Sequence, residues 1–205
     1  MARKLKSFSR PKSGTLKKAY DTIIVKKSKG GLYIQFNRPD RLNTMNEEMA
    51  ADIMHAMDAV ELDRTTLAVV LSGDERAFCA GADLGGFKDL PEDRYDNYRA
   101  RYNSRKNRQL YRFLMNYTKP VISAVEGYCL GGGFELAMLG DFIVAGEGAS
   151  FGLPEGRHSL IPGAGGTQNL PRLIGLPLAK ELIWTARRIT ATEAKEYRIV
   201  NHVVA

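Results

Sequence analysis

The sequence of 205 residues contains few of the residues that build metal centres and disulfide scaffolds: two cysteines, three histidines and one tryptophan. No C-x-x-C pair is present, so we expect Cys79 and Cys129 to be buried, reduced thiols in an intracellular protein rather than part of a disulfide framework. His55, His158 and His202 are scattered without the spacing of metal ligands, so no metal site is predicted.

Long apolar runs are also missing. No run approaches the roughly 20 residues that a membrane-spanning helix needs, so no membrane span is predicted. The hydrophobic content of 44% and the charged content of 26% are ordinary for a globular protein. The length favours one domain with a substantial core, and no repeat of fixed period is visible.

Acidic residues are absent from residues 1–20, whereas the whole chain carries a net charge of +7. The basic residues of this segment are Arg3, Lys4, Lys6, Arg10, Lys12, Lys17 and Lys18. They account for the entire net charge, so the rest of the chain is neutral. We predict a basic, disordered arm over 1–20 and one domain over 21–205.

The favoured role of the arm is that of a solvated extension, which predicts a cytoplasmic protein. Because the arm lacks acids and contains serine, a signal for the mitochondrial matrix is the alternative, and contact with a polyanion is another.

A glycine-rich stretch over residues 127–139 organises the remaining sequence. The β-branched run 120–125 predicts a buried strand just before it, and the residues after the three glycines have helical spacing. A strand, a glycine turn and a helix start leave free backbone N–H groups that can bind developing negative charge. Glu135 falls in the first helical turn and could point into the same pocket or act only as a cap.

Three further small-residue segments have distinctive sequences. Residues 77–84 read AFCAGADL after the apolar run 67–71, residues 150–156 read SFGLPEG, and residues 161–168 read IPGAGGTQ. Together with G-G-G-x-E, these motifs resemble those of the crotonase (enoyl-CoA hydratase/isomerase) family, and they occur in the family order. The resemblance extends from about Ile23 to Val204.

The resemblance implies an α/β fold, a crotonase-type spiral of β-β-α units. It also implies a homo-oligomer, either a trimer or a hexamer. Family members normally continue into a C-terminal helical segment that covers the active site or packs on a neighbouring subunit. We expect that segment to be absent here, which affects pocket closure, part of coenzyme A binding and assembly.

The chemistry implied by the resemblance is hydration of an α,β-unsaturated thioester. The N–H groups of Ala82 and Gly132 would form the oxyanion hole, because fixed backbone donors suit an oxygen that gains enolate charge. Glu135 would position the attacking water, and Glu155 would exchange the α-proton. The predicted protein is an acyl-CoA hydratase that adds water across the 2,3 double bond. No separate cofactor is expected, since coenzyme A enters with the acyl-CoA substrate.

Residues that bind substrate are implied in the same way. In the family, the segment matching 37–43 lines the coenzyme A channel, which makes Arg38 and Arg41 candidates; a solvated loop is the alternative for Arg38. The remaining substrate-binding candidates are Ala80, Asp83, Leu84, Gly131, Pro154 and Gly163. Gly85 and Gly86 suggest a movable loop over the substrate.

Two alternatives stay open. One is other crotonase-fold chemistry, either isomerisation or carbon–carbon hydrolysis. The other is a weakly catalytic protein that binds RNA through the arm and a helix predicted over 92–117. One face of that helix carries Arg94, Arg101, Arg105, Arg108 and Arg112, and the other carries Leu110, Phe113, Leu114 and Tyr117. A solvated basic face is the favoured interpretation, so nucleic acid is not predicted as a partner. The two glutamates favour a hydratase.

The remaining pattern predicts a hairpin of strands 23–25 and 32–36, and a helix from a capping box at 44–47 to about residue 61. The helix is expected to bury an apolar stripe of Met49, Ile53, Met57 and Val60, which keep helical spacing. Strands are also predicted over 67–72 and 141–145, and a helix over 177–186. A short helix opened by a capping box at 190–193 is predicted before residues 199–204.

Overall fold

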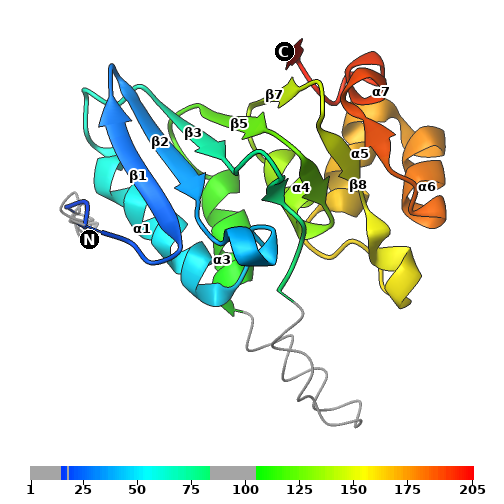
Figure 1. Ribbon diagram of the computed structural model, residues 1–205, viewed down its shortest axis with the longest axis horizontal. Helices are drawn as coiled ribbons and strands as arrows, with labels where there is room; N and C mark the ends of the chain where they lie inside the picture. Colours follow the sequence, from blue (N-terminus) through cyan, green and yellow to red (C-terminus); the bar gives the residue numbers. More distant parts are fainter. Residues whose placement is uncertain (1–14, 18, 84–104) are drawn as a thin grey trace, which may run out of the picture.

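The computed structural model describes residues 15–17, 19–83 and 105–205 (Figure 1). Leu84, the glycine pair at 85–86 and the first part of the helix predicted over 92–117 lie outside the described residues. Of the predicted arm, only its end is described: Leu16 packs against the core and the Lys17 ammonium lies 3.2 Å from the Asp52 carboxylate. The domain boundary at residue 21 therefore stays a prediction. Within the described ranges, no helix combines the length and apolarity that crossing a bilayer requires.

The predicted hairpin is confirmed. Strands β1 (Ile23–Ser28) and β2 (Gly31–Phe36) pair antiparallel. The turn residues Lys29 and Gly30 have φ values of 46° and 81°, the positive angles that a tight two-residue hairpin turn demands. Alternate residues of β2 are buried, which places one face of the hairpin against the core.

Two sheets form the framework of the fold. The larger sheet has the order β1-β2-β3-β5-β7-β10, and only its β1–β2 pair is antiparallel. Its other strands are β3 (Ala68–Ser72), β5 (Val121–Val125), β7 (Phe142–Gly146) and β10 (His202–Val204). The smaller sheet has the order β4-β6-β8-β9 and consists of β4 (Ala77–Cys79), β6 (Tyr128–Leu130), β8 (Ser150–Gly152) and the antiparallel β9 (Ile189–Thr190).

The chain alternates between the sheets, because β3, β5 and β7 of the larger sheet are followed by β4, β6 and β8 of the smaller one. Helices separate these strand pairs. This alternation is the β-β-α spiral that was predicted.

Helices α1 (Glu47–Glu61) and α3 (Arg105–Met115) lie side by side against the larger sheet (Figure 1). Short α4 (Gly132–Ala137) follows β6, and the chain end carries α5 (Gly166–Ile174), α6 (Leu176–Thr185) and α7 (Ala191–Glu196). The described residues also form two 3₁₀ helices, η1 (Pro39–Arg41) and η3 (Pro154–His158). The capping box at the start of α7 is confirmed.

Helix α1 begins later than the predicted capping box. Its N-cap is Asn46, whose side chain accepts a hydrogen bond from the Met49 N–H at 2.9 Å, rather than Thr44. The reason is tertiary: Met45 is still extended, since it forms a β-bridge with Ala82. The predicted apolar stripe is buried and comprises Met49, Ile53, Met57 and Val60.

The strand predicted over 120–125 is confirmed, but a further strand, which was not predicted, lies between it and the three glycines. Residues 121–125 form β5 of the larger sheet, but the chain then turns at Gly127, where φ is 56°, and enters β6 of the smaller sheet. An ideal Cβ on Gly127 would lie 2.1 Å from the Arg76 carbonyl oxygen, so the crossing requires glycine.

The core continues through both sheets. Phe36 packs on Phe78 with ring centroids 5.0 Å apart, and Phe134 packs on Phe151 at 5.4 Å. The two cysteines are buried, free thiols in paired positions of β4 and β6, as the sequence predicted. From α3, Leu110 and Leu114 enter the core.

The start of α4 packs on the end of β4 without room for a side chain. An ideal Cβ on Gly133 would lie 2.1 Å from the Cys79 carbonyl oxygen and 2.7 Å from Cys79 Cβ. In an ordinary helix, alanine is more favourable than glycine by about 1 kcal/mol. At this position the contact with Cys79 reverses that preference.

We therefore expect Gly133→Ala to lower the free energy of unfolding by about 1–3 kcal/mol, the usual cost of overpacking. For a chain of this size, the melting temperature falls by roughly 2–4 °C per kcal/mol. The matched control is Gly148→Ala, because an ideal Cβ there meets no atom within 4 Å. Equal melting temperatures for the two variants in a circular dichroism melt would contradict the close packing.

Candidate active site

The turn after β4 leaves one backbone donor unused. Met45 donates its N–H to the Gly81 carbonyl at 2.8 Å and accepts the Asp83 N–H at 2.9 Å. Ala82 lies between these two bonds, and Gly81 has a φ of 115°. The two bonds fix the turn, and the Ala82 N–H takes part in neither of them.

The start of α4 leaves a second donor unused. Gly131, the N-cap, has a φ of 52°; its N–H bonds the Gly152 carbonyl at 2.9 Å, and its carbonyl accepts the Glu135 N–H at 2.9 Å. The second bond holds the carbonyl of the Gly131–Gly132 peptide toward the helix. The Gly132 N–H belongs to the same rigid peptide and therefore points the other way.

These two donors lie beside the same small space. An ideal Cβ on Gly132 would lie 3.7 Å from the Ala82 nitrogen. Among the residues that the structure describes, neither the Ala82 N–H nor the Gly132 N–H has a backbone acceptor. Two convergent, unused N–H groups are what an oxyanion hole requires.

Glu135 is buried at this site, with only 2% of its surface exposed. Its Oε1 accepts hydrogen bonds from the Ala164 N–H at 2.8 Å and from the Gly166 N–H at 2.7 Å. Burial raises the pKa of the Glu135 carboxyl, and these two hydrogen bonds act against that rise. The glycine-rich segment that ends in the first residue of α5 thereby fixes one oxygen of the carboxyl group.

Glu155 approaches from η3, in whose first turn it lies. An ideal Cβ on Gly131 would lie 3.2 Å from Glu155 Oε1, so this carboxyl borders the start of α4. Its Oε2 is buried and has no hydrogen-bond partner among the described residues. The pKa of Glu155 is raised to about 7, mainly by burial; its own backbone N–H acts against the rise, and the neighbouring Glu135 adds to it.

The structure thus brings Ala82, Gly132, Glu135 and Glu155 together from three separate segments. The two carboxyl groups differ in environment, since Glu135 is hydrogen bonded and Glu155 has an unpartnered oxygen. A carboxyl with a pKa near neutrality can give and take a proton at the pH of a cell.

Arg38 faces the turn after β4. Its Nη2 lies 2.7 Å from Asp83 Oδ2, its Nη1 donates to the Thr44 carbonyl, and the side chains of Arg38 and Asp83 are only 17% and 20% exposed. This ion pair braces the segment that carries Ala82. Arg41 lies in η1 and is exposed.

Of the other predicted substrate-binding residues, those that the structure describes lie close in sequence to the site. Ala80 lies two residues before Ala82, Gly131 directly precedes Gly132, and Pro154 begins η3 directly before Glu155. Gly163 is exposed and precedes the Ala164 N–H that binds Glu135. A role in substrate binding remains a prediction for all of these residues.

Two residues that the sequence analysis did not single out support the site. Asn43 is fully buried; its Nδ2 donates to the Ala77 carbonyl at 2.8 Å, and its Oδ1 accepts the Arg38 N–H at 2.8 Å. Tyr111 of α3 donates its hydroxyl to the Gly132 carbonyl at 2.8 Å. The signal for Tyr111 was its place beside Leu110 on the apolar face of α3, which predicts burial but not a partner.

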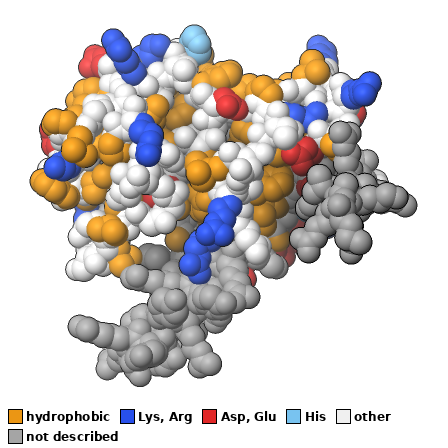
Figure 2. Space-filling model, turned by 180° about the vertical axis from the view of Figure 1, so that it is seen from behind, with side chains coloured by type: hydrophobic (Ala, Val, Ile, Leu, Met, Phe, Trp, Pro, Cys, Tyr) orange, Lys and Arg blue, Asp and Glu red, His pale blue; other side chains and the backbone are white. Residues whose placement is uncertain are grey.

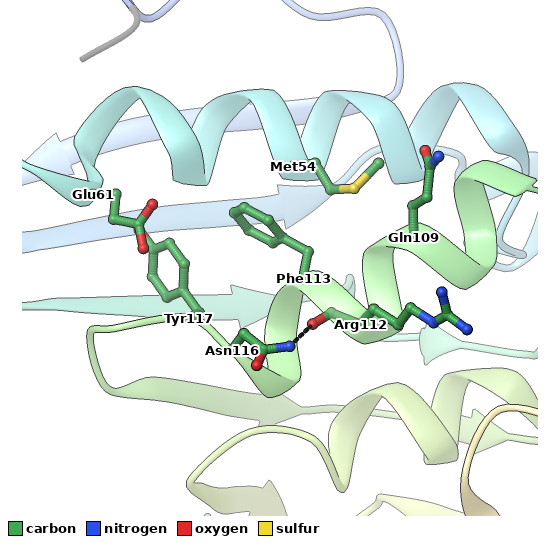
Figure 3. A pocket seen from close by; sticks show the side chains of 7 residues that line it. All are labelled: Met54, Glu61, Gln109, Arg112, Phe113, Asn116 and Tyr117. Atoms are coloured by element: carbon green, nitrogen blue, oxygen red, sulfur yellow. Dashed lines mark hydrogen bonds between the residues drawn. The ribbon is translucent and has the colours of Figure 1, made fainter. Parts of the chain in front are cut away.

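A hollow of about 500 Å³ lies elsewhere, between α1 and α3 (Figure 3). Its lining consists of Met54, Glu61, Gln109, Arg112, Phe113, Asn116 and Tyr117. None of the predicted site residues lines it. A second hollow of about 360 Å³ lies among η3, α5 and α6, where Ile161 and Trp184 are each 75% exposed. In the described part of the chain, no group of three or more His, Cys, Asp or Glu side chains could hold a metal ion.

Of the five arginines predicted on one face of the helix over 92–117, only Arg108 and Arg112 have described side chains, and both are exposed. On the face shown in Figure 2, basic side chains stand singly or in small groups, and the described residues form no continuous basic band there. That nucleic acid is not a partner therefore stays a prediction.

Comparison with known proteins agrees with the motifs. Residues 26–205 match the family model described as enoyl-CoA hydratase/isomerase. A probable enoyl-CoA hydratase of Rhizobium meliloti is 41% identical over 187 residues, which cover 91% of this chain and 70% of the relative. A crotonyl-CoA hydratase of Syntrophomonas wolfei is 38% identical over 187 residues, with the same shares covered.

A solved structure of similar sequence has the same fold. The enoyl-CoA hydratase from Bacillus anthracis superposes with a TM-score of 0.83 at 40% identity, covering 90% of this chain and 70% of that one. The chain therefore spans about 70% of the length of these relatives. The ordered motifs, the β-β-α spiral and these matches show that the chain belongs to the crotonase, or enoyl-CoA hydratase/isomerase, family.

Proposed function

We propose that the protein hydrates the 2,3 double bond of an enoyl-CoA thioester. One observation carries the proposal: the N–H groups of Ala82 and Gly132, which have no backbone acceptor among the described residues, lie next to a buried and a half-buried carboxyl group whose environments differ. The family is enzymatic, and the relatives named above as hydratases support this reaction.

The two donors would bind the thioester oxygen. As water attacks the β-carbon, electrons move onto this oxygen to give an enolate, and donors held in place need no reorganisation to stabilise the new charge. The coenzyme A portion enters as part of the substrate. Arg41, exposed in η1, is the proposed contact for its phosphates.

The carboxyl pair would move the protons. Glu135 holds the water and accepts a proton as the water oxygen bonds the β-carbon, while Glu155 in its acid form gives a proton to the α-carbon. The product gains one hydrogen and one hydroxyl group. The proton taken from the water remains on Glu135 and then passes to Glu155. This transfer restores the starting state of the pair, so no proton is released overall.

Isomerisation is the second candidate within the family, because the same pair could move a proton between carbons without water. The fixed position of Glu135 favours hydration, because two backbone N–H groups hold this carboxyl in one position, as is needed to hold the attacking water. Product analysis by mass separates the two reactions, because only hydration adds the mass of water.

We also propose that the protein is a homo-oligomer, a trimer or a hexamer. The apolar hollow beside η3, α5 and α6, with its exposed Ile161 and Trp184, supports an interface there. The cytoplasm is the proposed location, and the mitochondrial matrix is the alternative that the basic arm leaves open.

We expect Glu155→Gln to lower the turnover number for crotonyl-CoA by about 10²–10⁴-fold, the usual contribution of a general acid–base group. Substrate affinity should change little, because the amide keeps the shape of the acid. Loss of absorbance from the conjugated enone measures the rate. Glu135→Gln tests the other carboxyl, and Glu196→Gln, at an exposed position of α7, is the control. Near-normal turnover of Glu155→Gln would contradict its role.

The pH dependence follows from the pKa of Glu155, which is raised to about 7. Hydration needs one proton on the carboxyl pair, and this proton is lost as the pH rises through that value. We expect kcat/KM to fall above about pH 7. Because the reaction releases no net proton, dehydration of the hydroxyacyl product must show the same fall. Rates measured between about pH 5 and pH 9, on protein that stays folded by circular dichroism, check this. A flat profile above pH 7 would refute it.

Gly132→Pro tests the oxyanion hole directly. Gly132 is the first residue of α4, where proline fits the helix and the lost N–H makes no helical bond. The ring also adds a Cβ, which would lie 3.1 Å from the Tyr111 hydroxyl oxygen. We expect the variant to fold and to lose about 10²–10³-fold in turnover, the effect of one oxyanion donor. Binding of a saturated acyl-CoA should persist and serves, with a melting curve, as the control. A folded variant with normal turnover would place the oxyanion hole elsewhere.

A further inference from the structure

Helix α3 contributes one polar contact to the oxyanion turn. The hydroxyl of Tyr111 donates a hydrogen bond to the Gly132 carbonyl at 2.8 Å. An ideal Cβ on Gly132 would lie 3.1 Å from this hydroxyl oxygen and 3.7 Å from the Ala82 nitrogen. The tyrosine hydroxyl and the Ala82 donor therefore stand on two sides of the same small space beside Gly132.

The contact matters because Gly132 has no side chain to restrict its backbone. The peptide before Gly132 is held by the bond from the Glu135 N–H to the Gly131 carbonyl. The peptide after Gly132 carries the carbonyl that Tyr111 binds. With both neighbouring peptides restrained, rotation about the Gly132 backbone bonds is restrained as well, and its N–H keeps one direction.

We propose that Tyr111 is a positioning residue that aims the Gly132 N–H at the thioester oxygen. This inference rests on the proposed hydratase function. The hydroxyl proton is committed to the Gly132 carbonyl, so Tyr111 acts through the glycine and does not itself bind the oxyanion.

The surroundings of Tyr111 keep it a donor. Burial raises the pKa of its hydroxyl well above the ordinary value, and the neighbouring acidic groups Cys79, Glu135 and Glu155 raise it further. The hydroxyl consequently stays protonated throughout the pH range in which the carboxyl pair works.

The same region of the chain provides a matched control. Tyr117, just after α3, also donates its hydroxyl to a backbone carbonyl at 2.8 Å, but that carbonyl belongs to Met57 of α1. Tyr117 lines the hollow between α1 and α3 (Figure 3), and neither Glu135 nor Glu155 belongs to the lining of this hollow. Tyr111→Phe and Tyr117→Phe therefore remove equivalent hydrogen bonds, only one of which reaches the oxyanion turn.

The experiment compares these two variants with the wild-type chain. We expect Tyr111→Phe to lower kcat for crotonyl-CoA by about tenfold, less than loss of a whole oxyanion donor, with KM within about twofold. Tyr117→Phe should keep the wild-type kcat. Both variants should lose similar amounts in melting temperature, since each loses one hydrogen bond of the same kind.

A spectroscopic measurement separates an effect on the direction of the Gly132 N–H from a loss of protein stability. The carbonyl stretch of butyryl-CoA, a saturated acyl-CoA with no double bond to hydrate, labelled with ¹³C at the thioester carbon, should move to lower frequency on binding, because the two N–H groups polarise it. We expect a smaller movement in Tyr111→Phe than in the wild type or Tyr117→Phe. This shift is read from bound, folded protein and does not depend on turnover.

The outcomes are distinct. Equal kcat and equal carbonyl shifts in the two variants would overturn the role of Tyr111 while leaving the hydratase proposal standing. A wild-type chain that shifts the carbonyl but does not hydrate crotonyl-CoA would remove the proposed function, and the shift in Tyr111→Phe would still decide the inference. A wild-type chain that neither shifts the carbonyl nor hydrates would overturn both.

Discussion

The site depends on the contact between the start of α4 and the end of β4. Because Gly133 has no Cβ, its backbone can lie against the Cys79 carbonyl, where an ideal Cβ would come within 2.1 Å. This approach brings the Gly132 N–H to the same space as the Ala82 N–H of the next turn. The bridge between Met45 and Ala82 and the ion pair between Arg38 and Asp83 then keep that turn in place.

The carboxyl pair illustrates how one fold gives two acids different properties. Burying a charged group is costly unless hydrogen bonds compensate. The loop before α5 and the first residue of α5 each supply one N–H group to Glu135, so that carboxyl also joins α4 to α5. Glu155 has a buried oxygen without a partner, and its pKa rises to about 7. The unequal environments favour a division of labour between an anchored carboxyl and a carboxyl that exchanges protons.

Many elements could be predicted because their signals are local. The hairpin turn at Lys29 and Gly30, the apolar stripe of α1 and the capping box at Thr190 depend only on neighbouring residues. The elements that were missed depend on distant ones. Strands β4, β6 and β8 have three residues each, too few to show alternation, and form only because the smaller sheet pairs them.

The sequence by itself determined the family and the spiral of β-β-α units, and it singled out Glu135 and Glu155 as candidates. These features depend on motifs and their order, which can be recognised in the linear sequence. Only the tertiary structure decided that Asn46 rather than Thr44 caps α1, that Arg38 pairs with Asp83, and that Tyr111 reaches the Gly132 carbonyl. In each case the deciding contact comes from another segment, which for the α1 cap is the bridge between Met45 and Ala82. Local residue preferences carry no information about which distant group will supply such a contact.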